Sequence, residues 1–301
     1  MSRSVRWLPV LLSGFLLVPM AYAGTGCSQI RSGEKPGLPD GKVGKGPAEA
    51  PPSMAAPANE KATERADAAI EKALSFLAGS EPQPHLLLFL DVFHRRFGLE
   101  RFGDARAHYD ELMGQAPPEM LPYLRALRRM LDPNNAVEGD RYPCVPTVDL
   151  LTCPALYCDR LPAPPSYSAW LHASLAAGRK DLTHIGFANM LARDLGCQGF
   201  VPADVEAAAI DGMTKLVARD GRVTDLELEA ATFLLYLGHG DHLPDGFTEE
   251  VLAAQRPDGG WALDSAETQG PANWHPTCWA AWYLLESRPA PGGRPPIVPR
   301  R

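Results

Sequence analysis

Apolar residues recur at helical spacing along most of the chain between residues 62 and 288. The first such face consists of Ala66, Ala69, Ile70, Ala73, Leu74 and Leu77. Gly79 follows this face and ends the predicted helix. The same spacing predicts further helices over residues 85–97, 104–113, 118–131, 167–177, 182–195, 203–218 and 225–237. Because the alternation typical of strands is nearly absent, the pattern predicts an all-α domain over residues 62–288.

Residues 247–285 predict two more helices joined by a tight turn. The first ends near Gln255, whose amide can pair with carbonyls left open at a helix terminus. The Asp-Gly-Gly sequence at 258–260 tolerates positive φ, so the chain can reverse there. Trp261 is then expected to pack beside the helix end with its N–H on a backbone carbonyl. Pro276 suits the first turn of the second helix, since its missing N–H would have no partner there anyway.

This segment resembles the repeat of the terpenoid cyclase and protein prenyltransferase superfamily, often called the QW motif. The residues that carry the resemblance are Gln255, Asp258, Gly259, Gly260, Trp261, His275 and Pro276. Residues 72–77 resemble the start of a second copy, in which Glu81 stands where the Gln should be. The resemblance implies an α/α toroid, in which helical hairpins surround a central cavity. The helical pattern allows roughly five hairpins, so an open or incomplete toroid is one expected form.

The catalytic motifs of that superfamily are absent. Its cyclases protonate their substrate through an Asp-rich motif, and its protein prenyltransferases hold zinc with an Asp, a Cys two residues on and a later His. Neither Asp-x-Asp-Asp nor Asp-x-Cys occurs in this chain. We therefore expect a non-catalytic binding or scaffold domain rather than an enzyme. The alternatives are an enzyme acting on a glycan or polyprenyl-type substrate in the toroid cavity, and a purely structural module.

Two sets of residues are candidates for ligand contacts. His, Asp and Cys side chains that could hold zinc are His239, Asp241, His242, His275 and Cys278. The competing interpretation is a helix-ending turn at 238–241, a helix-entry histidine and a core thiol, so no cofactor is expected and zinc is the alternative. The second set, Trp261, Trp274, Trp279 and Trp282, could line a cavity for an apolar or glycan ligand. Its competing interpretation is plain core packing, because Trp279 and Trp282 lie at helical spacing.

The N-terminus has the features of an export signal. Arg3 and Arg6 precede an apolar run that is too short for a typical membrane span, so residues 1–26 are expected to be a signal peptide. Cys27 is a candidate for lipidation, which would anchor the protein to a membrane. We expect the protein in the cell envelope of a bacterium, in the periplasm or at the outer membrane, or else secreted.

Segments on either side of the helical domain have the composition of disordered chain. Residues 27–61 are rich in Pro, Gly and Ala, and residues 289–301 are rich in Pro, Gly and Arg. Because such segments carry few large apolar side chains, they cannot offset the entropy lost on ordering. We expect a disordered linker at 27–61 and a disordered tail at 289–301.

Four cysteines are candidates for disulfide bonds. An oxidising compartment favours disulfides, and the candidates are in or near a Cys/Pro-rich loop at 140–166: Cys144, Cys153, Cys158 and Cys197.

The formal net charge is −7, and loss of Arg3 and Arg6 with the signal peptide makes it −9. This charge excludes nucleic acid as an expected partner. Three arginines at 125, 128 and 129 are expected to form one solvated helix face.

Overall fold

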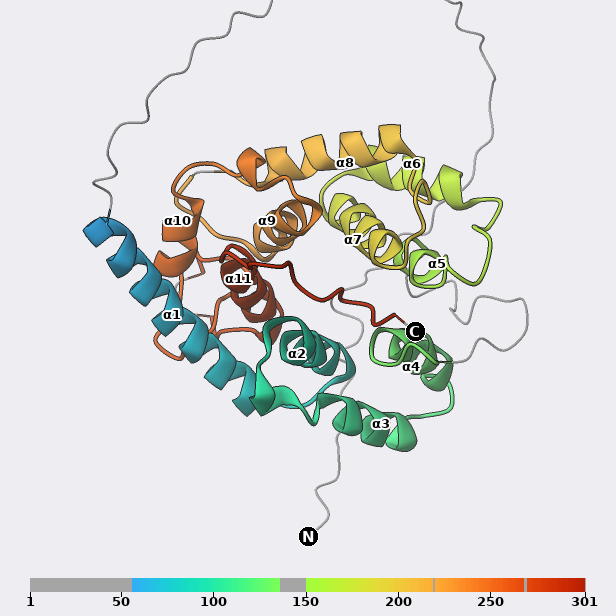
Figure 1. Cartoon of the computed structure of the whole chain (residues 1–301), viewed down its shortest axis with the longest axis horizontal. Coiled ribbons are helices and arrows are strands. Elements are labelled where there is room, and N and C mark those ends of the chain that lie inside the picture. The colour runs from blue at the N-terminus through green and yellow to red at the C-terminus, as the bar shows by residue number, and fades with distance from the viewer. Residues whose placement is uncertain (1–55, 136–149, 219, 268–269, 301) are drawn as a thin grey trace, which may run out of the picture. The chain divides into compact units, whose positions relative to one another are not determined.

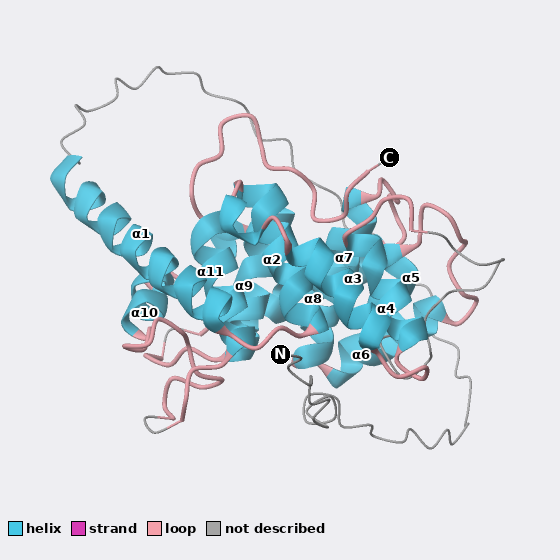
Figure 2. Ribbon diagram, turned by 90° about the horizontal axis from the view of Figure 1, so that it is seen from below, coloured by secondary structure: helices cyan, strands magenta, loops and turns pink. Residues whose placement is uncertain are grey.

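The computed structural model describes residues 56–135, 150–218, 220–267 and 270–300. The prediction of an all-α fold is confirmed, since the described ranges form helices and loops and contain no strand (Figure 2). The helices are α1 (Ala56–Gly79), α2 (Pro84–Phe97), α3 (Ala105–Gln115), α4 (Leu121–Leu127), α5 (Thr152–Leu156), α6 (Tyr167–Ala177), α7 (Lys180–Asp194), α8 (Ala203–Leu216), α9 (Asp225–Leu237), α10 (Phe247–Ala253) and α11 (Trp274–Glu286). Short 3-10 turns are η2 (Glu100–Phe102), η3 (Arg128–Met130) and η4 (Gly240–His242). None of the described helices is long and apolar enough to cross a membrane.

Several expected boundaries differ from the observed ones. Helix α1 begins at Ala56, inside the expected linker, and α5 lies inside the expected loop at 140–166. The expected signal peptide, the lipidation candidate Cys27 and most of the linker are outside the described residues.

The helices of the domain form an inner and an outer set (Figure 1). Figure 1 shows α2, α4, α5, α7, α9 and α11 nearly end-on, with α1, α3, α6, α8 and α10 lying outside them. The inner helices pack side by side in the order α2, α11, α9, α7 and α5. On the outside, α1 packs on α11, α3 on α2, and α8 on both α7 and α9. Hydrophobic residues from both sets form one continuous core.

The inner helices run in the same direction. At one end, Asp225 at the start of α9 accepts a hydrogen bond from His275 at the start of α11. At the other end, Tyr236 near the end of α9 donates to Asp194 at the end of α7. Arg96 near the end of α2 pairs with Glu286 at the end of α11. The domain therefore has an N-terminal end and a C-terminal end, named after the ends of the inner helices that gather there.

The turn at 255–261 joins α1, α10 and α11, and Gln255 binds carbonyl groups within α1 and within the turn rather than at the open end of a helix. The side-chain amide of Gln255 donates to the carbonyl oxygen of Ala69 in α1 at 2.7 Å and to that of Gly259 at 2.9 Å. The indole N–H of Trp261 donates to the carbonyl oxygen of Val251 in α10 at 2.8 Å. Pro276 is buried in the first turn of α11. The predicted backbone partner for the Trp261 indole is thus confirmed.

Glycine is required at the tip of this turn. Gly259 has φ of +93°, a region that side chains disfavour. A Cβ atom built on Gly259 would be 2.6 Å from the carbonyl oxygen of Lys72. The turn therefore lies directly against the backbone of α1, and Asp258 closes it by accepting from the Gly260 N–H at 3.1 Å.

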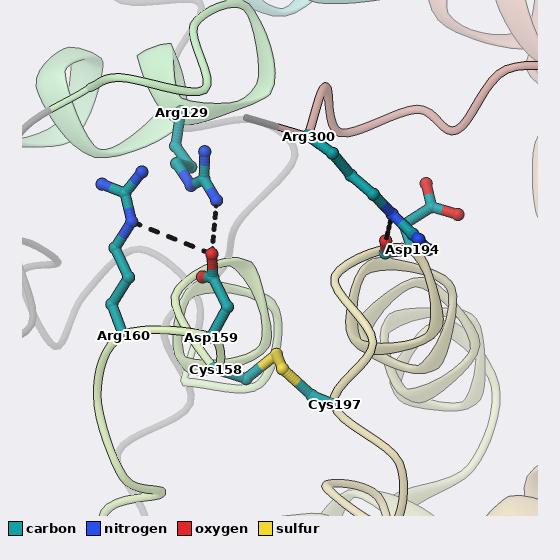
Figure 3. The surroundings of a disulfide bond; sticks show 7 residues. All are labelled: Arg129, Cys158, Asp159, Arg160, Asp194, Cys197 and Arg300. Carbon is teal, nitrogen blue, oxygen red and sulfur yellow. Dashed lines mark hydrogen bonds and ion pairs between the residues drawn. A yellow bond between two sulfur atoms is a disulfide. The ribbon is translucent and has the colours of Figure 1, made fainter.

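The C-terminal segment is packed on the C-terminal end of the inner helices, so the expectation of a disordered tail is wrong for residues 289–300. Ile297 and Val298 are fully buried. Their N–H groups donate to the Asp194 carboxylate, and Arg95 donates to the carbonyl oxygen of Ile297. Figure 3 shows Arg300 reaching the carbonyl oxygen of Asp194, at 2.6 Å. The composition of the tail does not predict this packing. Two apolar residues, Ile297 and Val298, and arginines of the domain are enough to hold the tail in place.

One disulfide joins two of the four predicted cysteines. Cys158, just after α5, is bonded to Cys197, just after α7 (Figure 3). Cys153 is disulfide-bonded as well, and Cys144 is outside the described residues. Cys278 is a free, buried thiol, which agrees with the interpretation of a core residue.

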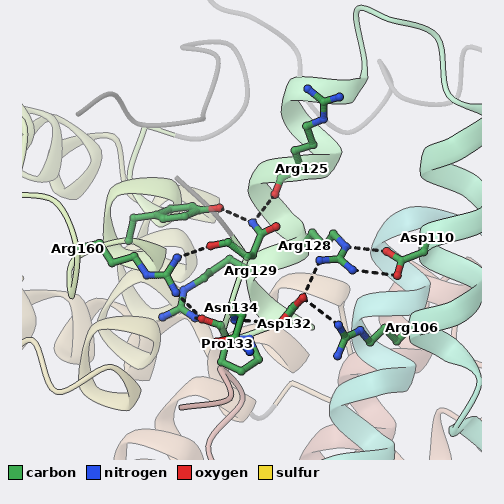
Figure 4. Close-up of polar contacts among 11 residues, drawn as sticks. Arg106, Asp110, Arg125, Arg128, Arg129, Asp132, Pro133, Asn134 and Arg160 are labelled. Carbon is green, nitrogen blue, oxygen red and sulfur yellow. Dashed lines mark hydrogen bonds and ion pairs between the residues drawn. The ribbon is translucent and has the colours of Figure 1, made fainter. Parts of the chain in front are cut away.

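Arg128 and Arg129, which follow α4, form a network rather than a solvated face, whereas Arg125 in α4 is exposed as expected (Figure 4). Arg128 pairs with both carboxylate oxygens of Asp110 at 2.7 and 3.0 Å and with Asp132 at 2.8 Å. Arg129 is buried and pairs with Asp159 at 2.8 Å. Sequence spacing could not show the contacts with Asp110 and Asp159, which come from α3 and from the segment after α5, whereas Asp132 is only four residues from Arg128.

Candidate functional site

A cluster of two carboxylates and one imidazole lies at the N-terminal end of the inner helices. The Nδ1 atom of His275 is 2.8 and 3.0 Å from the two carboxylate oxygens of Asp225. The Nε2 atom of the same ring is 3.6 Å from Oε1 of Glu229. The exposed fraction of the side chain is 32% for His275, 24% for Asp225 and 14% for Glu229. The cluster is therefore partly open to solvent, with Glu229 as its most enclosed member.

The local sequence explains why these side chains meet. Asp225 and Glu229 are four residues apart on α9, and residues at this spacing share one face of a helix. Thr224 fixes the start of α9 through the capping box that its spacing from Glu227 predicts. Asn273 caps α11 by accepting from the His275 N–H at 2.8 Å, which sets the position of that histidine.

Asp225 occupies a favourable position at the start of α9. The N-terminus of a helix carries a partial positive charge, which stabilises nearby negative groups. Asp225 is the first residue of α9 and benefits from this charge, whereas Glu229 lies one turn further along the helix.

Burial and mutual charge shift the protonation of the cluster. Burial raises the pKa of Glu229, and the positive charge of His275 only partly offsets this. Burial lowers the pKa of His275, but the hydrogen bond to Asp225 and the charges of Asp225 and Glu229 outweigh it, so the net shift is upward. Shifted pKa values in neighbouring titratable groups are typical of functional sites.

A second polar pair lies on the α2 side of the cluster. Tyr123, in α4, has its hydroxyl hydrogen-bonded to Nε2 of His85, in α2. Burial and, to a smaller extent, the positive charge of His275 lower the pKa of His85 to about 4. His85 is therefore neutral at pH 7, with its Nε2 atom hydrogen-bonded to the Tyr123 hydroxyl.

Aromatic rings form the apolar part of the site. The Phe89 ring packs edge-on against His275, with 6.4 Å between centroids, and against Trp279 at 4.7 Å. Trp274 is partly exposed, and its ring lies 5.2 Å from that of His275. Trp279 donates from its indole N–H to Nε2 of His275 at 3.3 Å. Phe89, Trp274 and Trp279 together are called the aromatic wall below.

The four tryptophans that were candidates for lining a cavity lie in two different places. Trp274 and Trp279 adjoin His275, whereas Trp261 and Trp282 are each 1% exposed in the core. The interpretation as core packing therefore applies to Trp261 and Trp282, and Trp279 is likewise buried, so Trp274 alone of the four is partly exposed.

The predicted histidine and cysteine set is also divided. His239, Asp241 and His242 lie in the turn that follows the C-terminus of α9, about 18 Å along that helix from Asp225. The rings of His239 and His242 are 5.3 Å apart, and His242 contacts the Thr214 hydroxyl at 3.2 Å. His275 instead meets Asp225 and Glu229, both of which the sequence interpretation missed. The available signal was an acidic pair at i and i+4 directly after a capping threonine.

A hollow lies at the C-terminal end. It has a volume of about 700 Å³ and is lined by Arg95, Arg96, Asp194, Tyr236, Arg294, Pro295, Pro296, Pro299 and Arg300. Arg95 and Arg96 already bind main-chain carbonyls, and Arg96 also binds the Glu286 carboxylate. These contacts hold the C-terminal segment, so the hollow is explained by that packing.

The three-residue cluster could hold a divalent metal ion, because one ligand atom from each side chain lies within 4.8 Å of the others. It could also act as an acid–base pair, with Asp225 orienting His275. Comparisons of the chain with protein-family models, with curated proteins and with solved structures find no match.

Proposed function

We propose that this chain is a ligand-binding domain of the α/α-toroid type, with its site at the N-terminal end of the inner helices. The parallel inner helices with an outer set around them support the toroid. The observation that carries the proposal is the position of the cluster Asp225, Glu229 and His275 beside the aromatic wall. The opposite end is covered by the C-terminal segment, so a ligand enters from the N-terminal end.

The site fits a ligand with an apolar or aromatic body and a polar group, such as a glycan or an isoprenoid-like lipid. The body packs on the aromatic wall, where partly exposed Trp274 offers a ring face. The polar group pairs with the carboxylates and imidazole of the cluster, which supply both donors and acceptors. Nucleic acid is not among the proposed partners, because the chain carries a formal net charge of −7.

The proposed location is the bacterial cell envelope or the exterior. The Cys158–Cys197 disulfide supports this, since disulfides persist in oxidising compartments. A signal peptide at 1–26 and a lipid on Cys27 would deliver and anchor the domain.

An enzyme is the second candidate, and one contact favours it. A carboxylate that accepts from Nδ1–H of a histidine, as Asp225 does at 2.8 Å, holds the ring in the tautomer in which Nε2 is the unprotonated nitrogen. The substrate would be of the glycan or polyprenyl type, in the same site.

Binding of N-phenyl-1-naphthylamine, a fluorescent apolar amine, tests the proposed function. The folded chain should bind one probe per molecule, and both Trp274→Ala and His275→Gln should weaken binding at least about tenfold. Trp170→Ala is the matched control, because Trp170 is a partly exposed tryptophan on outer helix α6. The proposal fails if the probe does not bind the folded chain, or if Trp170→Ala weakens binding as much as Trp274→Ala does.

A further inference from the structure

We infer that the hollow at the C-terminal end of the domain is a binding site for a phosphate or sulfate group, held by Arg294 and Arg300. The inference goes beyond the proposed function, because this site lies at the opposite end of the inner helices from the cluster around His275. Its structural basis is an excess of arginine around a hollow of about 700 Å³, together with arginine donors there that have no partner.

The side chains around the hollow favour an anion. Four arginines and a single acidic residue, Asp194, line it. The Asp194 carboxylate is already engaged, since it accepts from the N–H groups of Ile297 and Val298 and from the Tyr236 hydroxyl. Guanidinium groups bind the oxygens of phosphate and sulfate through several N–H donors at once.

Two of the four arginines are used by the packing of the protein itself. Arg95 pairs with Asp91 and donates to the carbonyl oxygen of Ile297, and Arg96 pairs with both carboxylate oxygens of Glu286. Asp91 and Glu286 therefore offset the charges of these two arginines. The positive charge that remains at the hollow is that of the other two, Arg294 and Arg300.

Arg294 has a buried donor that no group of the protein satisfies. Its side chain is 11% exposed, and its Nη2 atom donates to the carbonyl oxygens of Leu285 and Arg288. Its Nε atom is buried and has no hydrogen-bond partner within the described part of the chain. An oxygen of Glu286 lies 3.8 Å from Nε, which is too long for a hydrogen bond. Because an unpaired buried donor on a charged group is costly, a bound oxyanion would stabilise this arrangement.

Arg300 brings further donors to the same hollow. It uses Nε for the carbonyl oxygen of Asp194, and its two Nη atoms make no contact among residues 56–135, 150–218, 220–267 and 270–300. Ile297 and Val298, which lie between the two arginines in the sequence, are fully buried and anchor the backbone. The anchored segment thus holds both guanidinium groups at the hollow before a ligand binds, which lowers the entropic cost of binding.

The size of the hollow decides what can carry the phosphate or sulfate group. A volume of about 700 Å³ is in the range of small-molecule sites, which is roughly 300–1,000 Å³. The site therefore admits the group either as a free ion or as part of a small organic ester. Three prolines of the C-terminal segment, Pro295, Pro296 and Pro299, supply an apolar side against which the body of an ester would pack.

Equilibrium dialysis of radiolabelled phosphate against the full folded chain tests the inference, at neutral pH and constant ionic strength. We expect one phosphate per chain, with affinity lowered at least about tenfold in Arg294→Gln and in Arg300→Gln, because each change removes charged hydrogen bonds. Arg222→Gln is the matched control. It makes the same change of charge at an exposed arginine that pairs with Asp264 near the start of α9, and it should bind phosphate as the parent chain does.

Competition identifies the source of the group. Unlabelled sulfate and glycerol phosphate should both displace the labelled phosphate, and glycerol should not. If glycerol phosphate competes better than unlabelled phosphate, the site is assigned to an ester, and if it competes equally or less well, the site is assigned to the free ion.

The remaining outcomes decide against the inference. Circular dichroism identifies any variant that fails to fold, and if Arg294→Gln does so through loss of its contacts with Leu285 and Arg288, Arg300→Gln decides the result. The inference is overturned if the folded parent chain binds no stoichiometric phosphate, or if both hollow variants bind phosphate as the parent does. It is equally overturned if Arg222→Gln weakens binding as much as they do.

Discussion

Asp225 holds the imidazole of His275 across the boundary between α9 and α11, with 2.8 Å between its carboxylate oxygen and Nδ1. Fifty positions of sequence separate the two residues, and the capped starts of two parallel helices bring them together. This contact fixes which ring nitrogen faces Glu229, and therefore what the site can bind.

Replacing Asp225 by Asn should lower the pKa of His275. Asp225 raises that pKa through a hydrogen bond and through its charge, and the amide removes the charge. Because the folded pKa of His275 is raised, its contribution to stability is present at low pH and is lost as the pH rises through that pKa. An NMR titration of the His275 ring measures the change. An unchanged or higher pKa in Asp225→Asn would show that the contact does not stabilise the imidazolium.

Replacing Trp261 by Ala should destabilise the whole domain by about 3–5 kcal/mol, because it removes a fully buried indole. Urea unfolding measures this free energy. Trp261→Phe separates packing from hydrogen bonding, since it keeps most of the ring but leaves the Val251 carbonyl without the indole N–H. It should cost about 1–3 kcal/mol from the unpaired carbonyl. A Trp261→Ala chain as stable as the parent would refute the structural role of the motif.

Replacing Gly259 by Ala should cost more free energy of unfolding than replacing Gly238 by Ala. Both glycines have strongly positive φ, +93° and +89°, so the backbone strain in the two variants is similar. At Gly259 the new Cβ atom would meet the backbone of α1. At Gly238 a new Cβ atom would have no neighbouring atom within 4 Å. The difference between the variants should be about 1–3 kcal/mol in urea unfolding. Equal costs would mean that the turn does not pack on α1 as described.

Acidification should destabilise the domain through His85. Its folded pKa is about 4 and the ordinary value is 6.5, so the unfolded chain binds the proton more readily between these values. At neutral pH both states are neutral at His85, and as the pH falls below 6.5 stability is lost, reaching about 3 kcal/mol near pH 4. His85→Gln should remove this part of the pH dependence, whereas His108→Gln, at an exposed position, should leave it unchanged. Measuring each variant against the parent chain cancels the opposite effect of buried acids such as Asp91, whose pKa is raised by burial.

Much of the fold follows from local pattern, because helical periodicity and helix termination are local properties. The sequence predicts α6 (Tyr167–Ala177) and α9 (Asp225–Leu237) with their observed limits. It also predicts the turn at Gln255–Trp261, since glycines and a tryptophan at fixed spacing leave few conformations.

The candidate site depends on contacts that are not local. Glu229 looks like an exposed polar residue of α9 in the sequence, and only the packing of α9 on α11 and α7 encloses it. The C-terminal segment is similar, because Ile297 and Val298 find their pocket only after the inner helices have assembled. Composition alone could not predict either outcome.

The most direct test of the proposed site uses the eight histidines of the chain as reporters. Histidine-selective ¹H–¹⁵N NMR spectra are recorded while N-phenyl-1-naphthylamine is added to the folded protein. Three histidines lie at the N-terminal end, at or beside the cluster: His85, His184 and His275. We predict that their ring signals shift together and saturate with one probe per chain, and that those of His94, His108, His172, His239 and His242 stay in place. Shifts confined to His239 and His242, or no saturable shift at His275, would contradict the assignment of the site to this end of the domain.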